Sequence, residues 1–267
     1  MSKNLKVLSR LFLILGLLFL STNPILPSNG LPGITEHLGA QIPLNLKFTN
    51  SHGKSVLLKD IINKPTVIDF VYYKCTGICT PLMAEVSDVV GKINFDPGKE
   101  YNLLCVSIDP SETPAVAAEK KHAMFSICTK NLTDSSWIFL TGDSTSIHKL
   151  TNIAGFNYIR SNGGFLHKGI LIFVDKTGKI VQYLAPGYGK DSGNFELLPA
   201  EFELAIKKAA KGELTPTIAK VLQTCFTFIP EGRTVFVLFM VFLSSIVMIT
   251  AVFFIIKKTK VKKIIKQ

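Results

Sequence analysis

Short apolar runs alternate in character along the middle of the chain, some typical of buried strands and others spaced like the inner face of a helix. The run from Pro65 to Tyr73 is rich in β-branched and aromatic residues, which indicates a strand buried on both faces. It leads directly into a segment in which Leu82, Val86 and Val90 recur at helical spacing. The same alternation continues to residue 210. The expected strands cover residues 65–73, 101–108, 137–140, 169–174 and 179–184, and the expected helices lie within 74–93 and at 114–128, 144–154 and 197–210.

Polar turns add antiparallel pairs to this pattern. A turn at 51–54 would join residues 44–50 to residues 55–61 as an early hairpin, and a turn at 175–178 would join the last two strands. Strands that alternate with helices pair in parallel, because the helix carries the chain back to the same end of the sheet. The pattern therefore predicts an α/β fold with parallel strands and two hairpins.

The first 22 residues have the pattern of an export segment. Three basic residues precede an apolar run of ten residues at 11–20, as in secretory signals. Ten helical residues rise about 15 Å, against roughly 30 Å for a bilayer core. No obvious small-residue cleavage site follows, so a signal peptide and a retained N-terminal anchor both stay open for residues 1–22. Residues 23–40, which begin with a stretch rich in Pro, Gly, Ser and Asn, are expected to form a linker.

A second apolar segment predicts a transmembrane helix at 233–256. Residues 234–256 carry no charge, and these 23 residues are long enough to span a bilayer. The tail at 257–267 has six lysines and no acid, so the positive-inside rule predicts that it is cytoplasmic. We therefore expect the main domain on the non-cytoplasmic (periplasmic) side of a bacterial-type cell membrane, with residues 213–232 as a tether.

The overall charge follows from this topology. The formal net charge is +11, from 30 basic and 19 acidic residues. Nine of the basic residues lie at the two ends, which contain no acid, and this leaves 21 basic and 19 acidic residues between them. The basic ends are expected to contact anionic lipid headgroups. Nucleic acid is therefore excluded as a partner, and the membrane is expected as one.

Cys75 and Cys79 are the most informative residues, because they lie where a strand meets a helix. On the first helical turn they would lie at i and i+4 on one face. A helix N-terminus favours the thiolate, which attacks disulfides and binds soft metals. The pair could form a disulfide, coordinate Cu(I), or alternate between the two. A purely structural disulfide is the alternative, although a bridge across so short a loop stabilises little.

A third ligand is sought among the five histidines. His167 follows a glycine pair and precedes an apolar strand, so a loop at the mouth of the sheet could bring its imidazole to a site there. From the residues alone, its role as a ligand stays open. Two thiolates and one imidazole suit Cu(I), whereas structural zinc takes a fourth ligand. The other histidines are His37, about which the sequence says nothing, and His52, His122 and His148, which are expected to be solvated.

Three further cysteines lie outside this motif. Cys105 is flanked by apolar residues within a strand and is expected to be a buried, inert thiol. Cys128 ends a helix and is expected to pack. Cys225, shortly before the apolar span, is the odd cysteine, and its role stays open.

The chain resembles the Sco/SenC family of thioredoxin-fold copper proteins. The blocks DFVYYKCTGICTPLM, VSIDPSETPAVAAEKK, WIFLTG, AGFNYIR and FLHKGILIFVDKTGKIVQYL occur in the order of the family, across roughly residues 41–212. The resemblance implies a thioredoxin-like fold with an added N-terminal hairpin. It also implies that Cys75 and Cys79 are the paired thiols and that His167 is the metal-binding histidine. Asp109 falls at the aspartate of the family.

The resemblance further implies a function. Members of the Sco/SenC family are associated with delivering copper to the binuclear copper centre of cytochrome c oxidase, or with reducing the cysteines of that centre. We therefore expect a copper chaperone that binds Cu(I), and binding of Cu(II) stays open. Its expected partner is the copper-receiving subunit of the oxidase. A thiol-disulfide oxidoreductase acting on exported proteins is the alternative, with Cys75 and Cys79 as its catalytic redox pair. A membrane sensor is disfavoured, because the predicted cytoplasmic tail is only a lysine-rich run.

Two features depart from the family pattern. Thr80 stands between the second cysteine and Pro81, where relatives often have proline directly. The predicted C-terminal anchor is also unusual, since many relatives have only an N-terminal one. Both departures indicate a divergent branch and bear more on the delivery target than on the copper site.

Overall fold

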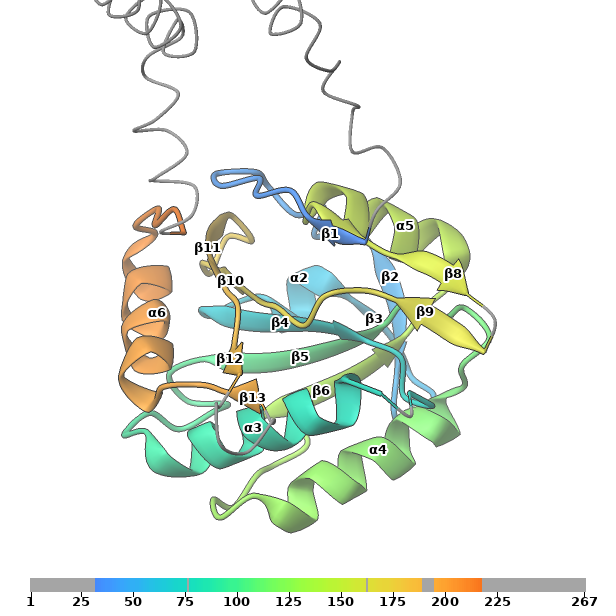
Figure 1. The fold of residues 1–267 in the computed structure, drawn as a ribbon, viewed down its shortest axis with the longest axis horizontal. Coiled ribbons are helices and arrows are strands. Elements are labelled where there is room, and N and C mark those ends of the chain that lie inside the picture. Colours follow the sequence, from blue (N-terminus) through green and yellow to red (C-terminus); the bar gives the residue numbers. More distant parts are fainter. Residues whose placement is uncertain (1–31, 76, 162, 189–194, 218–267) are drawn as a thin grey trace, which may run out of the picture. The chain divides into compact units, whose positions relative to one another are not determined.

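A computed structural model describes residues 32–75, 77–161, 163–188 and 195–217 (Figure 1). The chain divides into two compact units. The first, called the main unit, contains Ile34–Phe156 and the described residues from Gly169 onward; the second, called the hairpin unit, contains Asn157–Lys168 and the described residues up to Gly33.

The main unit is built on a seven-stranded sheet of order β11-β10-β4-β5-β6-β2-β3. The three central strands β4, β5 and β6 are parallel, and the strands on either side pair antiparallel. Every residue of β4 and β5 is buried, as expected for strands covered on both faces. The strands are β2 (Lys47–Asn50), β3 (Ser55–Leu57), β4 (Thr66–Val71), β5 (Asn102–Ser107), β6 (Trp137–Thr141), β10 (Leu171–Val174) and β11 (Ile180–Leu184).

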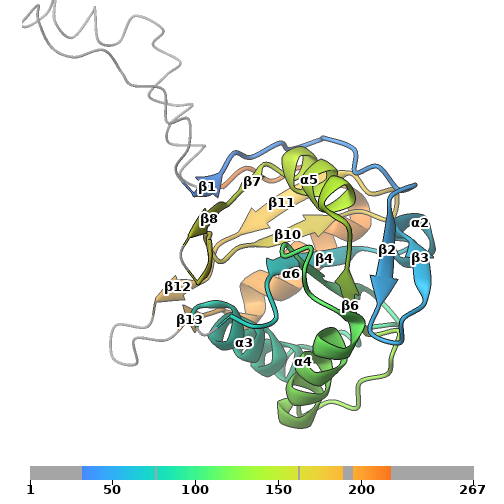
Figure 2. The ribbon, with the colours of Figure 1, turned by 90° about the vertical axis from the view of Figure 1, so that its right-hand side faces the viewer.

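Helices cover both faces of this sheet. On one face, α3 (Cys79–Lys92), α4 (Pro114–Ile127) and α6 (Pro199–Lys211) contribute to one core cluster with β4, β5 and β10. On the other face lies α5 (Ser144–Ile153), on the opposite side of the sheet from α3 and α4 in Figure 2. The predicted α/β class, with parallel central strands and two hairpins, is therefore confirmed.

The early hairpin departs from its predicted length. β3 ends at Leu57, and Leu58–Ile61 form a short helix, α2. Leu58 and Ile61 are both buried, and the Asp60 carboxylate accepts a hydrogen bond from the Leu57 N–H at 3.4 Å. Burial three residues apart fits a helical turn rather than a strand.

Short strands complete the described chain. In the hairpin unit, β8 (Ile159–Ser161) pairs antiparallel with β9 (Gly164–Leu166). Their three-residue length hides them from any periodicity in the sequence. The other short strands are β1 (Gly33–Ile34), β7 (Phe156–Asn157), β12 (Gly187–Tyr188) and β13 (Phe195–Glu196).

Several predicted segments at the ends of the chain lie outside the described residues. These are the export segment at 1–22, the membrane helix at 233–256 and the tail at 257–267, with part of the linker and most of the tether. Within residues 32–217, as far as the structure describes them, no helix combines the length and apolarity needed to cross a membrane.

Candidate functional site

The two cysteines of the predicted site flank the start of α3. β4 ends at Val71 and α3 begins at Cys79, so Cys75 lies in the β4–α3 loop. The Cys75 N–H donates to the Tyr72 carbonyl at 3.1 Å, which closes a tight turn before the helix. The condition that both cysteines lie on the first helical turn is therefore not met. Only Cys79 is helical, and the loop brings Cys75 to it.

The two thiols form a reduced, hydrogen-bonded pair. Both cysteines are buried thiols rather than disulfide sulfurs, with exposures of 8% for Cys75 and 0% for Cys79. The hydrogen bond between their side chains is the largest cause that lowers the Cys75 pKa to about 5. Burial opposes this shift, and the N–H groups of Cys79 and Gly77 add to it; the Gly77 N–H donates to Cys75 Sγ at 3.3 Å. The same side-chain hydrogen bond, together with burial, raises the pKa of Cys79. At neutral pH the pair is therefore one thiolate and one thiol.

A carboxyl group that the sequence analysis missed lies in the core of β4. Asp69 alternates with Val67 and Val71, so it faces the same helices as they do. It is 5% exposed, and neither carboxyl oxygen has a hydrogen-bond partner among the described residues. Burial raises the Asp69 pKa to about 7, and its charge is one of the smaller causes that raise the Cys79 pKa. One signal could have revealed it, an acidic residue inside the apolar run VIDFV.

A second missed carboxylate, Glu112, contacts the β4–α3 loop. It lies between β5 and α4, is buried, and accepts hydrogen bonds from the backbone N–H groups of Tyr73 and Lys74. Asp109, at the aspartate of the Sco/SenC pattern, lies in the same turn and accepts from the Ser111 N–H and hydroxyl. Nothing in the SETP segment distinguished Glu112, because its partners are remote in sequence.

Thr80, the residue that departs from the family pattern, has a defined structural role. Its hydroxyl accepts a hydrogen bond from Lys120 Nζ at 3.0 Å and donates to the Cys75 carbonyl at 3.5 Å. The departure therefore links α4 to the loop and brings a cation close to the cysteine pair.

The other described cysteines are set apart from this pair. Cys105 is 0% exposed, its Sγ accepts a hydrogen bond from Trp137 Nε1 at 3.1 Å, and burial raises its pKa. It is a buried thiol, as expected. Cys128 is half-buried, and its thiol donates to the Ser87 carbonyl at 3.6 Å. Cys225 lies outside the described residues.

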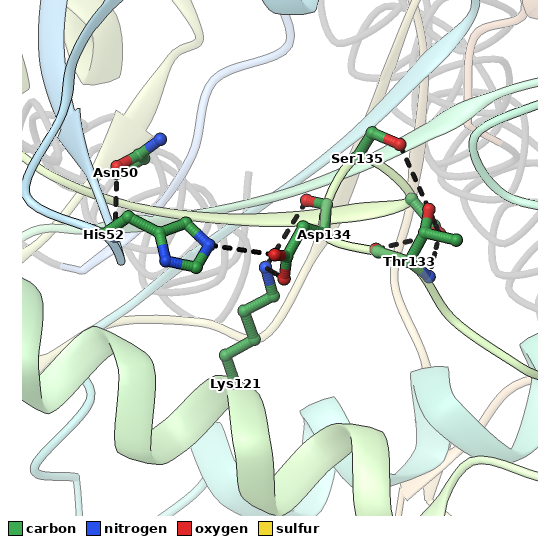
Figure 3. A network of polar contacts seen from close by, with 7 residues as sticks. Asn50, His52, Lys121, Thr133, Asp134 and Ser135 are labelled. Atoms are coloured by element: carbon green, nitrogen blue, oxygen red, sulfur yellow. Dashed lines mark hydrogen bonds and ion pairs between the residues drawn. The ribbon is translucent and has the colours of Figure 1, made fainter.

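His52, which was expected to be solvated in the turn of the early hairpin, contacts the Asp134 carboxylate. His52 Nε2 lies 3.0 Å from an Asp134 carboxylate oxygen, and the other oxygen accepts from Lys121 Nζ at 2.6 Å (Figure 3). Asp134 thus joins the turn of the early hairpin to α4. His52 and Asp134 are largely exposed, so the pair is worth little by itself.

His167, the expected third ligand, lies in the hairpin unit directly after β9. Its Nδ1 is 3.1 Å from the Lys168 carbonyl, in an exposed contact. Among the side chains that the structure describes, no group of three or more His, Cys, Asp or Glu residues is arranged to hold a metal ion. The structure thus pairs Cys75 with Cys79, and the ligand role of His167 stays a prediction.

Comparison with protein families gives one match over most of the folded region. The SCO1/SenC family model matches residues 36–194. A curated relative, the SCO1 protein homolog of Bacillus subtilis (strain 168), is 26% identical over 155 residues, which cover 54% of this chain and 77% of the relative.

Solved structures agree with this match. A protein of Aquifex aeolicus VF5 superposes with a TM-score of 0.57 and 21% identity, covering 66% of this chain and 95% of that one. A SCO1/SenC family lipoprotein from Bacillus anthracis str. Ames gives 0.50 and 22% identity, covering 67% and 99%. The fold is therefore the thioredoxin-like α/β fold of this family, as the sequence predicted.

Proposed function

Because this chain belongs to the SCO1/SenC family, we propose that it binds copper and supplies it to a respiratory cytochrome c oxidase. In this proposal Cys75, Cys79 and His167 bind the ion. The protein then delivers copper to, or reduces the cysteines of, the copper centre of the oxidase. The observation that carries the proposal is the reduced pair of thiols at the start of α3.

The donor chemistry of this pair fits copper as cargo. Cu(I) favours soft thiolate ligands at low coordination number. The Cys75 and Cys79 side chains are hydrogen-bonded to each other, so both sulfurs can reach one small ion. Cys75 is already a thiolate at neutral pH, which leaves one proton to be released when a metal binds.

His167 is proposed as the third ligand on the family pattern. His167 lies directly after β9, and its imidazole, a borderline nitrogen donor, complements two sulfurs for Cu(I). For Cu(II) the imidazole matters more, because Cu(II) takes nitrogen donors readily. We propose that the protein handles Cu(I) as cargo and holds Cu(II) only if His167 is present.

The location proposed for this activity is the outer face of the cell membrane. The apolar segment at 234–256 and the lysine-rich tail, both outside the described residues, support a C-terminal anchor with a cytoplasmic end. Such an anchor would keep the copper site close to a membrane-bound oxidase and limit its search to two dimensions.

A Cu(I) titration of the full-length protein in detergent tests this proposal. The affinity is measured by competition with a chromophoric Cu(I) chelator, for wild type, Cys75→Ser, Cys79→Ser and His167→Ala. His148→Ala, which removes an exposed imidazole from α5, is the matched control. We expect about one Cu(I) per wild-type chain, almost complete loss in either cysteine variant, and a roughly tenfold to hundredfold weaker affinity in His167→Ala. Undiminished binding in Cys75→Ser would refute the proposal.

The low pKa of Cys75 also favours a second candidate function, thiol-disulfide exchange. The Cys75 thiolate would attack a substrate disulfide and expel one substrate thiolate. Cys79 would then attack Cys75, forming the Cys75–Cys79 disulfide and releasing the substrate as a dithiol. This reaction needs only the two thiols. Disulfide reduction that persists in His167→Ala, combined with equal copper affinity in that variant and wild type, would place the second function first.

A further inference from the structure

The β4–α3 loop contains backbone donors that neither the sheet nor the helix can satisfy. The β4–β5 ladder ends with the hydrogen bond from the Ile108 N–H to the Val71 carbonyl at 2.7 Å, and α3 begins at Cys79. Tyr73 is 2% exposed, so water does not replace a protein partner for its N–H group. An unpaired buried N–H costs about 1–3 kcal/mol. An acceptor must therefore come from elsewhere in the chain.

Glu112 supplies this acceptor with both oxygens of its carboxylate. Its Oε2 accepts from the Tyr73 N–H at 2.8 Å, and its Oε1 accepts from the Lys74 N–H at 2.7 Å. Oε2 also accepts from the Ser107 hydroxyl at 2.6 Å. Hydrogen bonds to an ionised acceptor are shorter and stronger than neutral ones. Two adjacent donors held by one carboxylate fix both the position and the direction of the chain immediately before Cys75.

Glu112 is itself held on a rigid part of the fold. It is 5% exposed, and its N–H donates to the Asp109 carbonyl at 3.1 Å, closing the turn after β5. It directly precedes Thr113, the N-cap of α4, with Pro114 as the first helical residue. The carboxylate is therefore positioned by β5 on one side and α4 on the other. Through its hydrogen bonds to the Tyr73 and Lys74 N–H groups, it fixes the position of the loop.

We propose that Glu112 is a positioning residue for the Cys75–Cys79 pair. By holding the Tyr73 and Lys74 N–H groups, it places Cys75 where Cys79 and Gly77 can donate hydrogen bonds to its sulfur. Glu112 touches neither sulfur in this arrangement and acts through the loop alone. The inference rests on the proposed function of the pair and adds to it the residue that sets the geometry of the two sulfurs.

This arrangement stabilises the reduced pair, because the hydrogen bond between the Cys75 and Cys79 side chains is lost when the two sulfurs form a disulfide. Releasing the loop should remove that stabilisation. The reduction potential of the Cys75–Cys79 couple should then become more negative, and the affinity for Cu(I) should fall. A role of Glu112 in fold stability alone would instead lower the unfolding temperature and leave both quantities of the folded protein unchanged.

The test compares Glu112→Ala and Glu112→Gln with wild type in the full-length protein. Glu119→Ala, which removes an exposed carboxylate from α4, controls for the change in charge. We expect a Cu(I) affinity about tenfold to hundredfold weaker in Glu112→Ala. Glu112→Gln should fall between this variant and wild type, since one amide oxygen can still accept from one of the two N–H groups. Glu119→Ala should match wild type.

The second measurement is a redox titration of the same variants against reduced and oxidised glutathione. Two glutathione thiols give up two electrons and two protons; the Cys75–Cys79 disulfide takes up both electrons and one proton to give one thiolate and one thiol, and the other proton goes to the buffer. We expect the equilibrium constant of Glu112→Ala to shift at least tenfold toward the disulfide, equivalent to about 30 mV. Thermal unfolding of each variant establishes that it is folded at the assay temperature.

The outcomes separate this inference from the proposed function. Copper binding in wild type with equal affinity and equal potential in Glu112→Ala overturns the inference and leaves the proposed function intact. Absence of copper binding in wild type refutes the proposed function, and the glutathione titration then decides the inference. If Glu112→Ala does not fold, Glu112→Gln carries the same decision, and wild-type values in that variant overturn the inference.

Discussion

The β4–α3 loop, which contains Cys75, and the β8–β9 hairpin, which directly precedes His167, are stabilised in different ways. In the loop, Glu112 reaches the Tyr73 N–H from 39 residues further along the chain. In the hairpin, Phe165 packs edge-on against Tyr158 with ring centroids 5.6 Å apart, and the Arg160 guanidinium lies 5.1 Å from the Phe165 ring. The first region thus depends on contacts between distant segments, whereas these hairpin contacts join residues at most seven positions apart.

The difference teaches where each part of the site is vulnerable. A change in the loop or in the core beneath it should alter the stability of the whole main unit, because those contacts cross several elements. A change in the hairpin should be felt locally, since short antiparallel pairs open with less free energy than a core sheet. Substitutions in each region measure whether the two differ in this way.

The largest expected effect comes from Asp69, in the core beneath the loop. Its pKa is raised by burial from 3.8 to about 7, so the folded protein holds this proton more tightly than the unfolded chain. Stability contributed by the protonated form is present below pH 4 and is lost as the pH rises through about 7. The increase in the Asp69 pKa is equivalent to about 4 kcal/mol of folding free energy. Denaturant unfolding of wild type and Asp69→Asn, between pH 4 and pH 8, measures it.

The expected result is a change in the difference between the two proteins. Asparagine does not titrate, so Asp69→Asn should gain stability relative to wild type as the pH rises from 4 to 8. Taking this difference cancels contributions that both proteins share, such as that of the Cys75 thiolate. A difference that stays constant over this range would show that Asp69 does not hold a proton in the folded state.

The next effect concerns the reactivity of Cys75 in the loop. With a pKa of about 5, Cys75 is almost entirely thiolate at pH 6, whereas an unperturbed thiol is overwhelmingly protonated there. Alkylation by iodoacetamide, with the site read by mass spectrometry, should therefore be half-maximal near pH 5. Cys79→Ala removes the hydrogen bond that lowers this pKa most, so the midpoint should move up and the rate at pH 6 should fall about tenfold or more.

Cys105 serves as the internal control for this measurement. It is 0% exposed and its pKa is raised, so it should stay unlabelled under the same conditions. Equal midpoints in wild type and Cys79→Ala would mean that the two thiols do not interact.

The smallest effect is expected in the hairpin. Phe165→Ala removes the ring that packs against Tyr158 and Arg160, contacts worth about 0.5–1.5 kcal/mol each. Hydrogen exchange read by mass spectrometry should become faster in residues 159–166. Exchange in β4 and α3 should keep its wild-type rate. Faster exchange in β4 would contradict the distinction between the two regions.

Much of the fold could be predicted from local pattern. The strand expected at 65–73 is β4 at Thr66–Val71, and the helix expected at 114–128 is α4 at Pro114–Ile127. Both succeed because apolar spacing and the Thr113-Pro114 start signal are local properties of the chain. The strand predicted at Leu58–Ile61 was wrong, since four residues of mixed polarity fit a strand as well as a helical turn.

The candidate site divides along the same line. Cys75 and Cys79 could be found because they are close in sequence and lie at a strand-to-helix junction. Glu112 could not be found, because its partners lie 38 and 39 residues away and no spacing rule connects them. Asp69 left only a weak signal, and its raised pKa arises from neighbours contributed by other strands and helices.

By itself, the sequence determined which residues are apolar, where strands give way to helices, and which side chains can bind a soft metal, because these depend on side-chain chemistry and on neighbours a few residues away. Only the tertiary structure decided that Cys79 opens the helix while Cys75 lies in the loop, and that one buried carboxylate holds that loop while another has no hydrogen-bond partner among the described residues. The physical reason is that burial and hydrogen bonding between remote segments exist only once the chain has closed on itself.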